Sequence, residues 1–123
     1  MGKVVLIVED NEMNLTLIRD LLQMSGYSTF EAGDGKQATE IAQEKYPDLI
    51  LMDIHLPIMD GLEATRILKN DDATKNIPIV ALTASVMKND KEKIHEAGCD
   101  GYIPKPIEIE KFLEKVAEFI DKE

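Results

Sequence analysis

Three carboxylates follow apolar runs in the sequence, and they are the first candidates for chemistry. Glu9 and Asp10 come directly after the run at residues 4–8, and Asp53 comes after the run at residues 49–52. If they converge in a low-dielectric crevice, they repel one another, and a lone group there is driven to protonate. A cation resolves this conflict. Because the donors are hard oxygens without a Cys or His cluster, Mg²⁺ is favoured over zinc or copper, and Mn²⁺ is possible.

Thr83 and Lys105 stand at the ends of two further apolar segments and add a hydroxyl and an ammonium to this set. A carboxylate can attack a phosphoryl group, and catalysis of this transfer consists mostly of positioning and of neutralising charge on the phosphoryl oxygens. The carboxylate that stands alone at its strand end is Asp53. Taken singly, Asp53 could form a turn, Thr83 could be a cap and Lys105 could be a solvated lysine. Their joint placement favours a phosphoryl-transfer site.

The elements that must position these residues alternate between apolar runs and helical patterns. We expect strands at residues 4–8, 27–30, 49–52, 78–82 and 102–103. We expect helices at residues 14–24, 35–45, 62–70, 88–97 and 107–120, where apolar residues recur at helical spacing. Parallel neighbours need crossover connections, and these are right-handed. The predicted fold class is therefore α/β, a doubly wound five-stranded parallel sheet with helices on both faces, with a site beyond the carboxyl ends of its strands.

Composition and charge limit the classes of function. The chain has 123 residues, 44% of them hydrophobic, and we expect a single domain spanning residues 1–123. The formal net charge of −10 disfavours direct binding to nucleic acid or to an anionic membrane. The one cysteine, Cys99, cannot form an internal disulfide, and the run at residues 4–8 is too short for a signal peptide or a membrane span. These features indicate a cytoplasmic protein.

The candidate residues share one order along the chain, each group at the end of a predicted strand: Glu9–Asp10, then Asp53 with PIMDG after it, then Thr83–Ala84, then Lys105–Pro106. In this order and spacing the chain resembles the receiver domain of two-component response regulators over essentially its whole length. The resemblance implies the flavodoxin-like strand order 2-1-3-4-5. It also implies that Asp53 accepts a phosphoryl group in a Mg²⁺-dependent reaction.

The resemblance also implies a set of metal ligands. Asp10 would bind Mg²⁺ directly, and Glu9 would assist through water. Asp53 would contribute a carboxylate oxygen, and His55 would contribute its backbone carbonyl.

Four residues would carry the response to phosphorylation. By the resemblance, Lys105 would pair with the phosphoryl oxygens, and the bond between Lys105 and Pro106 would be cis. Thr83 would move to hydrogen-bond the phosphoryl group, and Tyr102 would turn inward behind it. This pair would convert a local change of charge into an altered surface.

Two further side chains would influence how long the phosphoryl group survives. His55 lies two residues after Asp53, and Ser85 lies two residues after Thr83. In the family that the chain resembles, both positions flank the phosphoryl group. Our hypothesis is that the bulky imidazole of His55 slows the attack of water.

The expected role is that of a phospho-acceptor that assists its own phosphorylation and dephosphorylation, and not that of an enzyme. The expected partners are a sensor histidine kinase or a histidine phosphotransfer protein as donor, and a downstream protein target. We expect a monomer or a weak dimer. The favoured interpretation is a stand-alone receiver that signals through protein contacts. Two alternatives remain open: a receiver domain excised from a hybrid histidine kinase, and a receiver-like binding module that never accepts phosphate.

Two other activities that use similar folds or chemistry are disfavoured. A flavodoxin-like flavin carrier needs a Ser/Thr/Gly-rich phosphate loop after the first strand, whereas EDNEMN at this place is acidic. A phosphatase of the haloacid dehalogenase type has its nucleophile after the first strand and a second Asp two residues on. The residue two positions after Asp53 is His55.

Overall fold

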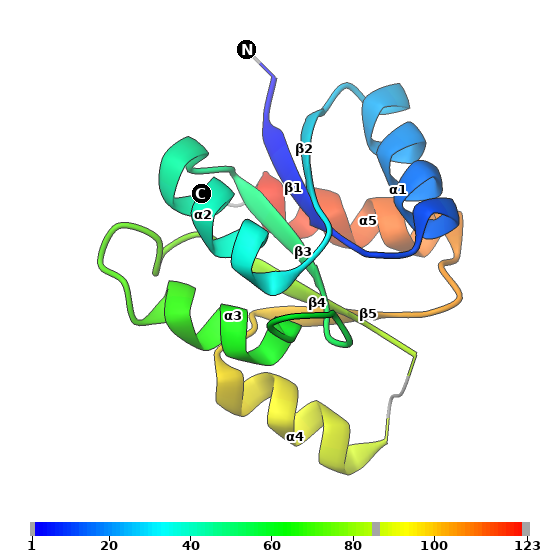
Figure 1. Ribbon diagram of the computed structural model, residues 1–123. Helices are drawn as coiled ribbons and strands as arrows, with labels where there is room; N and C mark the ends of the chain where they lie inside the picture. The colour runs from blue at the N-terminus through cyan, green and yellow to red at the C-terminus, as the bar shows by residue number, and fades with distance from the viewer. Residues whose placement is uncertain (1, 85–86, 122–123) are drawn as a thin grey trace.

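A parallel sheet of five strands lies between two layers of helices in the computed structural model, which describes residues 2–84 and 87–121 (Figure 1). The strands are β1 (Val4–Val8), β2 (Ser28–Ala32), β3 (Leu49–Asp53), β4 (Ile79–Thr83) and β5 (Gly101–Pro104). They lie in the order β2-β1-β3-β4-β5, and every neighbouring pair is parallel. The predicted fold class and strand order are confirmed.

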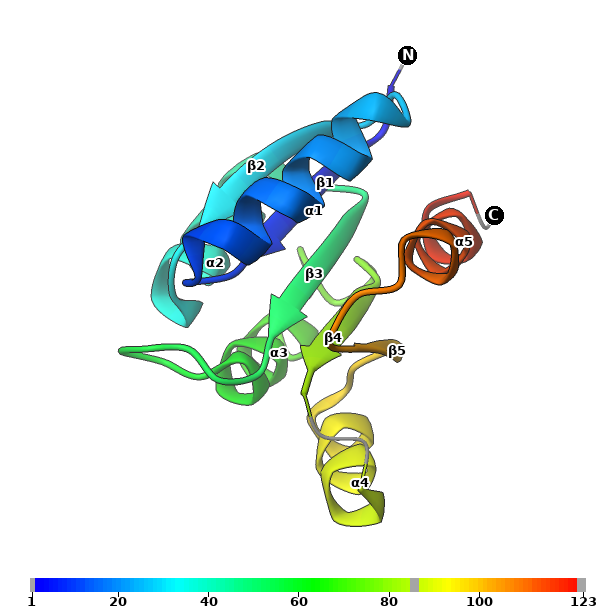
Figure 2. The ribbon, with the colours of Figure 1, turned by 90° about the vertical axis from the view of Figure 1, so that its right-hand side faces the viewer.

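The helices cover both faces of the sheet. They are α1 (Glu12–Met24), α2 (Gly35–Lys45), α3 (Gly61–Lys69), α4 (Lys88–Ala97) and α5 (Ile109–Ile120). Figure 2 shows α1 and α5 on one face, and α2, α3 and α4 on the other. Each face buries its own apolar cluster, so the central strands need apolar residues on both sides. Accordingly, every residue of β3 and β4 is buried.

Three helices that follow strand ends begin at side-chain caps. Asn11, Asp34 and Asp60 each accept a hydrogen bond from the backbone N–H three residues later, at 2.8 to 3.0 Å. Such a bond satisfies one of the free amides of the first turn. These caps fix α1, α2 and α3 directly after the sheet edge at which the candidate residues lie.

The predicted boundaries differ from the observed ones where apolar periodicity is weak. Helix α1 begins two residues before the predicted start, because Asn11 caps it. Strand β2 ends at Ala32 and not at residue 30, because its pairing with β1 continues to the register Val8 with Ala32. Since β2 is an edge strand with exposed side chains, its sequence carries little apolar signal.

Candidate functional site

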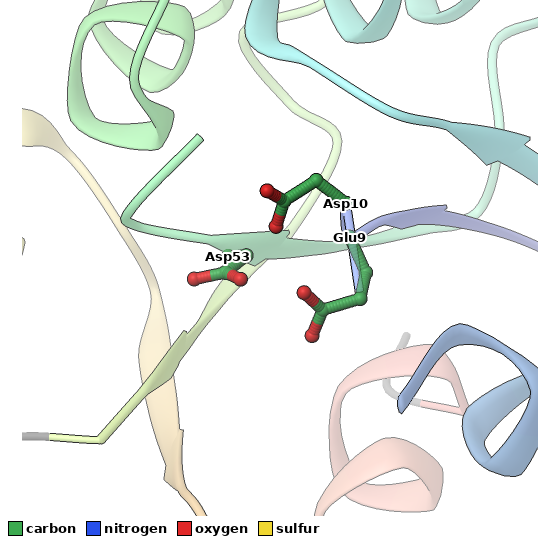
Figure 3. A group of neighbouring side chains, drawn as sticks. All are labelled: Glu9, Asp10 and Asp53. Carbon is green, nitrogen blue, oxygen red and sulfur yellow. The ribbon is translucent and has the colours of Figure 1, made fainter. Parts of the chain in front are cut away.

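The three carboxylates converge at the carboxyl edge of the sheet, as Figure 3 shows. Glu9 and Asp10 follow β1, and Asp53 is the last residue of the neighbouring strand β3. One oxygen from each carboxylate lies within 4.8 Å of the others. Glu9 is 1% exposed and Asp53 is 6% exposed, whereas Asp10 faces solvent. The arrangement concentrates negative charge at a largely buried place that is open on the side of Asp10.

Lys105 joins two of these carboxylates. Its Nζ donates to Glu9 Oε1 at 2.8 Å and to Asp53 Oδ2 at 3.0 Å. Its backbone N–H donates to the carbonyl of Thr83 at 2.8 Å, which continues the pairing of β4 with β5. The peptide bond between Lys105 and Pro106 is cis. The hydrogen bond to Thr83 at the end of β4 thus helps to position the backbone of Lys105, and with it the ammonium, beside the two carboxylates.

Burial and charge act together on this cluster. Burial raises the pKa of Glu9, and the neighbouring Asp53 raises it further, while Lys105 only partly opposes this. Burial lowers the pKa of Lys105, but its hydrogen bonds to Glu9 and Asp53 outweigh that effect, so its pKa lies above the usual value. The raised pKa keeps the ammonium of Lys105 charged, where it lies within hydrogen-bond distance of two carboxyl groups.

The second oxygen of Asp53 is held by the backbone. Asp53 Oδ1 accepts the N–H of His55 at 3.1 Å. This contact was not among the predictions from the sequence, although an aspartate often accepts a hydrogen bond from the amide two residues later, and this tendency could have revealed it. The bond aims the carboxylate of Asp53 along the connection to α3. The predicted use of the His55 carbonyl as a metal ligand stays a prediction.

The start of α3 lies against the end of β3. The N–H of Gly61 donates to the carbonyl of Ile54 at 2.9 Å. A Cβ at Gly61 would lie 2.0 Å from the carbonyl oxygen of Asp53 and 2.9 Å from its carbonyl carbon. Only a glycine allows this approach. The glycine of the PIMDG motif therefore helps to set the position of the Asp53 backbone.

Between β3 and α3 the chain makes a tight turn. The N–H of Met59 donates to the carbonyl of Pro57 at 2.7 Å, and Ile58 between them has a φ of 66°. This is a γ-turn, a strained form of backbone for a β-branched residue. The carbonyl of Met59 also accepts the N–H of Gly35 at 3.0 Å, so the start of α2 supports the turn.

Thr83 and Tyr102, the two residues predicted to respond to phosphorylation, line two separate hollows. Thr83 is buried at the end of β4, and it lines a hollow of about 160 Å³ together with His55 and Lys93 of α4. Tyr102 pairs with Ala81 in the sheet, and its half-buried ring lies 5.3 Å from the Nζ of Lys91. Tyr102 lines a separate hollow of about 300 Å³ between β5 and α5. The structure thus brings Thr83, but not Tyr102, to the edge of the carboxylate site.

The remaining predictions for this region concern the metal and Ser85. Three carboxylates with oxygens this close form the kind of hard donor set that Mg²⁺ accepts, so the residues present fit the ion. Ser85 lies outside the described residues.

No helix within residues 2–84 and 87–121 has the length and apolar character that a membrane crossing requires.

Comparison with protein families matches residues 5–117 to the response regulator receiver domain. Among curated proteins, the polar-differentiation response regulator DivK of Brucella anthropi is 49% identical over 120 residues, which cover 98% of each chain. DivK of Brucella ovis is 48% identical over the same length, again with 98% of each chain covered.

Comparison with solved structures gives the same result. The receiver domain of the sensor histidine kinase PA1611 from Pseudomonas aeruginosa, which has a magnesium ion in its active site cleft, matches with a TM-score of 0.92 and 35% identity. The match covers 99% of this chain and 100% of that one. A co-crystal structure of the histidine phosphotransfer protein Ypd1 with the receiver domain of Ssk1, both from Saccharomyces cerevisiae, matches with a TM-score of 0.90 and 32% identity. It covers 98% of this chain and 90% of that one.

Proposed function

This chain belongs to the response regulator receiver domain family, and we propose that Asp53 is its phospho-acceptor. The observation that carries the proposal is the environment of this carboxylate. Asp53 ends a fully buried central strand, and its two oxygens are held by Lys105 Nζ and the His55 amide. A carboxylate that is fixed in position beside a cation is suited to attack a phosphoryl group.

We propose that the site takes Mg²⁺, and Mn²⁺ as a second hard cation. Asp10 and Asp53 would supply carboxylate oxygens, Glu9 would assist through water, and His55 would supply its backbone carbonyl. Support comes from the converging oxygens and from the magnesium ion in the active site cleft of the PA1611 receiver. When bound, the ion would neutralise negative charge on the phosphoryl oxygens.

The transfer itself is an exchange of one bond for another. A carboxylate oxygen of Asp53 forms a bond to phosphorus, and the bond from phosphorus to the donor's histidine nitrogen breaks, with its electron pair going to the imidazole. Lys105 places positive charge beside the incoming phosphoryl oxygens. In the later hydrolysis, a water oxygen forms a bond to phosphorus and the bond from phosphorus to Asp53 breaks, with its electron pair returning to the carboxylate. The same groups would assist this step.

We propose that Thr83 and Tyr102 report the phosphoryl group to the surface. Thr83 lies one residue beyond the position in β4 that pairs with Asp53, and from there its hydroxyl would hydrogen-bond a phosphoryl group added to Asp53. Tyr102 lies on the next strand, half-buried beside α4 and α5. A shift of Thr83 toward the phosphoryl group would free space for the ring, and a downstream protein target would recognise the altered face.

The surface around the site supports a protein as the donor. Met13, Ile58 and Met87 are 83%, 82% and 72% exposed, and they lie at the starts of α1 and α4 and in the turn after β3. An imidazole reaches the nearly buried Asp53 only if the donor's surface covers this rim. The apolar rim therefore suits a sensor histidine kinase or a histidine phosphotransfer protein with apolar residues around its histidine.

We also infer a cytoplasmic location and a monomer or weak dimer. The described cysteine, Cys99, is unpaired and buried, which suits a reducing compartment. The net charge of −10 supports protein partners and not nucleic acid.

The experiment that tests the proposal uses acetyl phosphate as a small donor. The intact mass would be measured with and without Mg²⁺ for the wild type, for Asp53→Asn, and for Asp72→Asn as a control acid on the surface. We expect a gain of one phosphoryl group that needs both Mg²⁺ and Asp53 and that Asp72→Asn leaves unchanged. If no mass gain occurs while a known receiver is modified alongside, the chain is a binding module that does not accept phosphate.

A further inference from the structure

The start of α2 touches the connection between β3 and α3, which spans residues 54–60. The N–H of Gly35, the first residue of α2, donates to the carbonyl of Met59 at 3.0 Å. Gly35 is buried, and a Cβ on it would lie 2.9 Å from the carbonyl carbon of Met59 and 3.1 Å from the carbonyl oxygen of Asp60. A side chain at this place would therefore displace the connection. Glycine is the residue that lets α2 begin in contact with it.

The start of α2 is fixed by its own cap. Asp34 Oδ1 accepts the N–H of Gln37 at 2.8 Å, and Gln37 Oε1 accepts the N–H of Gly33 at 2.8 Å. Two side chains thus bind two backbone amides, as in a capping box. Because this cap fixes the backbone on both sides of Asp34, it also fixes the direction in which the N–H of Gly35 points. Helix α2 therefore offers the connection a rigid donor.

The connection itself holds a strained conformation. Ile58 has a φ of 66° although it is β-branched, and its side chain is 82% exposed, so burial of this side chain does not offset the cost. Strain of this kind persists only where surrounding contacts determine the backbone. The bond from Gly35 to Met59 is such a contact, because it fixes the residue directly after Ile58. The shape of the turn thus depends in part on α2.

The other end of the connection lies in the site. The N–H of His55 donates to Asp53 Oδ1 at 3.1 Å, and the carbonyl of His55 is the proposed metal ligand. Only three residues separate His55 from Met59, and the ring of one of them, Pro57, fixes its own φ. So short a segment has few ways to absorb a displacement of Met59. The start of α2 therefore acts on the site, although none of the proposed ligands belongs to α2.

We propose that Gly35 is a positioning residue, through which the start of α2 holds the connection in the shape that lets the backbone carbonyl of His55 bind the metal. This role rests on the proposed function, which takes Mg²⁺ as the metal and this carbonyl as one ligand. A supporting group of this kind tunes a metal site without touching the ion. Any shift of the start of α2 would therefore change the affinity of the site for Mg²⁺.

The first experiment is a calorimetric titration with Mg²⁺ alone, in the absence of any phosphoryl donor. Gly35→Ala is compared with the wild type and with two control variants. In Gly33→Ala, the new Cβ would make only an ordinary contact, 3.7 Å from Gln37 Oε1. In Gly101→Ala, the new Cβ would lie 2.7 Å from Phe119 Cζ at the amino end of β5, so this variant overpacks the fold away from the site.

We expect Gly35→Ala to bind Mg²⁺ roughly tenfold more weakly than the wild type, as when a group that supports a metal ligand is lost. Gly33→Ala should bind as the wild type does. Gly101→Ala should have a lower melting temperature but an unchanged affinity for Mg²⁺. An unchanged affinity in Gly35→Ala overturns the proposal, and so does an equal loss in Gly101→Ala, which would reflect general destabilisation.

A second pair of variants tests the same role without an added atom. Asp34→Asn keeps a side chain that can cap α2 but loses the charge, whereas Asp34→Ala loses both. Asp34→Ala should bind Mg²⁺ several-fold more weakly than Asp34→Asn, because the start of α2 is no longer fixed. Equal affinities in this pair overturn the role of α2, and the pair decides the question if Gly35→Ala does not fold.

These titrations separate the role of Gly35 from phospho-acceptance. A chain that binds Mg²⁺ but gains no phosphoryl mass from acetyl phosphate refutes the phospho-acceptor proposal and leaves the comparison of Mg²⁺ affinities intact. A wild-type chain that binds no Mg²⁺ overturns the role of Gly35, whatever the mass experiment shows.

Discussion

Replacing Gly61 by alanine tests whether the start of α3 sets the position of the acceptor. The added Cβ would lie 2.0 Å from the carbonyl oxygen of Asp53 and 3.0 Å from the Cα of Ile54. Atoms of a close-packed interior do not approach to 2.0 Å, so either α3 or the end of β3 has to move by about 1 Å. The change adds a single methyl group and alters no charge. Any effect on phosphorylation therefore comes from geometry.

The expected size of the effect follows from that displacement. Overpacking of this kind costs about 1–3 kcal/mol in the free energy of unfolding. For a domain of this size, each kcal/mol lowers the melting temperature by roughly 3–5 °C, so we expect a fall of about 3–15 °C. A misplacement of about 1 Å at a reacting group can lower the rate about 100-fold. We expect phosphorylation to slow more than the loss of folded protein explains.

Two measurements decide this prediction: the melting temperature, and the rate of mass gain with acetyl phosphate well below that temperature. Gly33→Ala is the matched control, because its Cβ would meet nothing closer than Gln37 Oε1 at 3.7 Å, an ordinary contact. The control should behave as the wild type in both measurements. A Gly61→Ala variant that melts within about 2 °C of the wild type and reacts at the same rate would refute the reasoning.

Three further predictions concern other side chains. Burial raises the pKa of the Cys99 thiol, so a thiol reagent at pH 8 should modify the native chain far more slowly than the unfolded chain; equal rates would contradict the burial. His55→Ala should shorten the lifetime of the aspartyl phosphate, followed by loss of the phosphoryl mass after the donor is removed, and an unchanged lifetime would rule out shielding by the imidazole. Met13→Gln should slow phosphoryl transfer from a phosphorylated histidine phosphotransfer protein but not from acetyl phosphate. Met24→Gln, at the other end of α1 and 85% exposed, should change neither rate of transfer. An equal slowing in both variants would argue against a role of the apolar rim in binding the donor.

Much of the fold could be predicted because its signals are local. The continuous apolar run before Asp53 indicates a strand buried on both faces, and β3 is buried at every position. The identification as a receiver is confirmed by the family match over residues 5–117. The end of β2 could not be predicted, because its exposed residues are placed by pairing with β1 and not by burial of their own.

The sequence could predict which side chains converge at the edge of the sheet, but not the contacts between them. Glu9, Asp10, Asp53 and Lys105 meet because parallel strands bring their carboxyl ends to one edge. The contact between Glu9 and Lys105 has no local signal, since 96 residues separate them and only the assembled sheet brings them together. The ring of Tyr102 packs on the face of the sheet that α4 covers, beside Lys91, and this placement likewise depends on contacts that form only in the assembled fold.

The separation of Glu9 from Lys105 has a consequence for synthesis of the chain. During translation, Asp53 leaves the ribosome long before Lys105 does, so a nascent chain holds the acceptor without the cation that aims at it. Strands β1, β3, β4 and β5 must assemble before the ammonium of Lys105 reaches Glu9 and Asp53. Under the proposed function, phospho-acceptance at Asp53 would therefore be a property of completed molecules, and an unfinished copy would not compete with them for the phosphoryl donor.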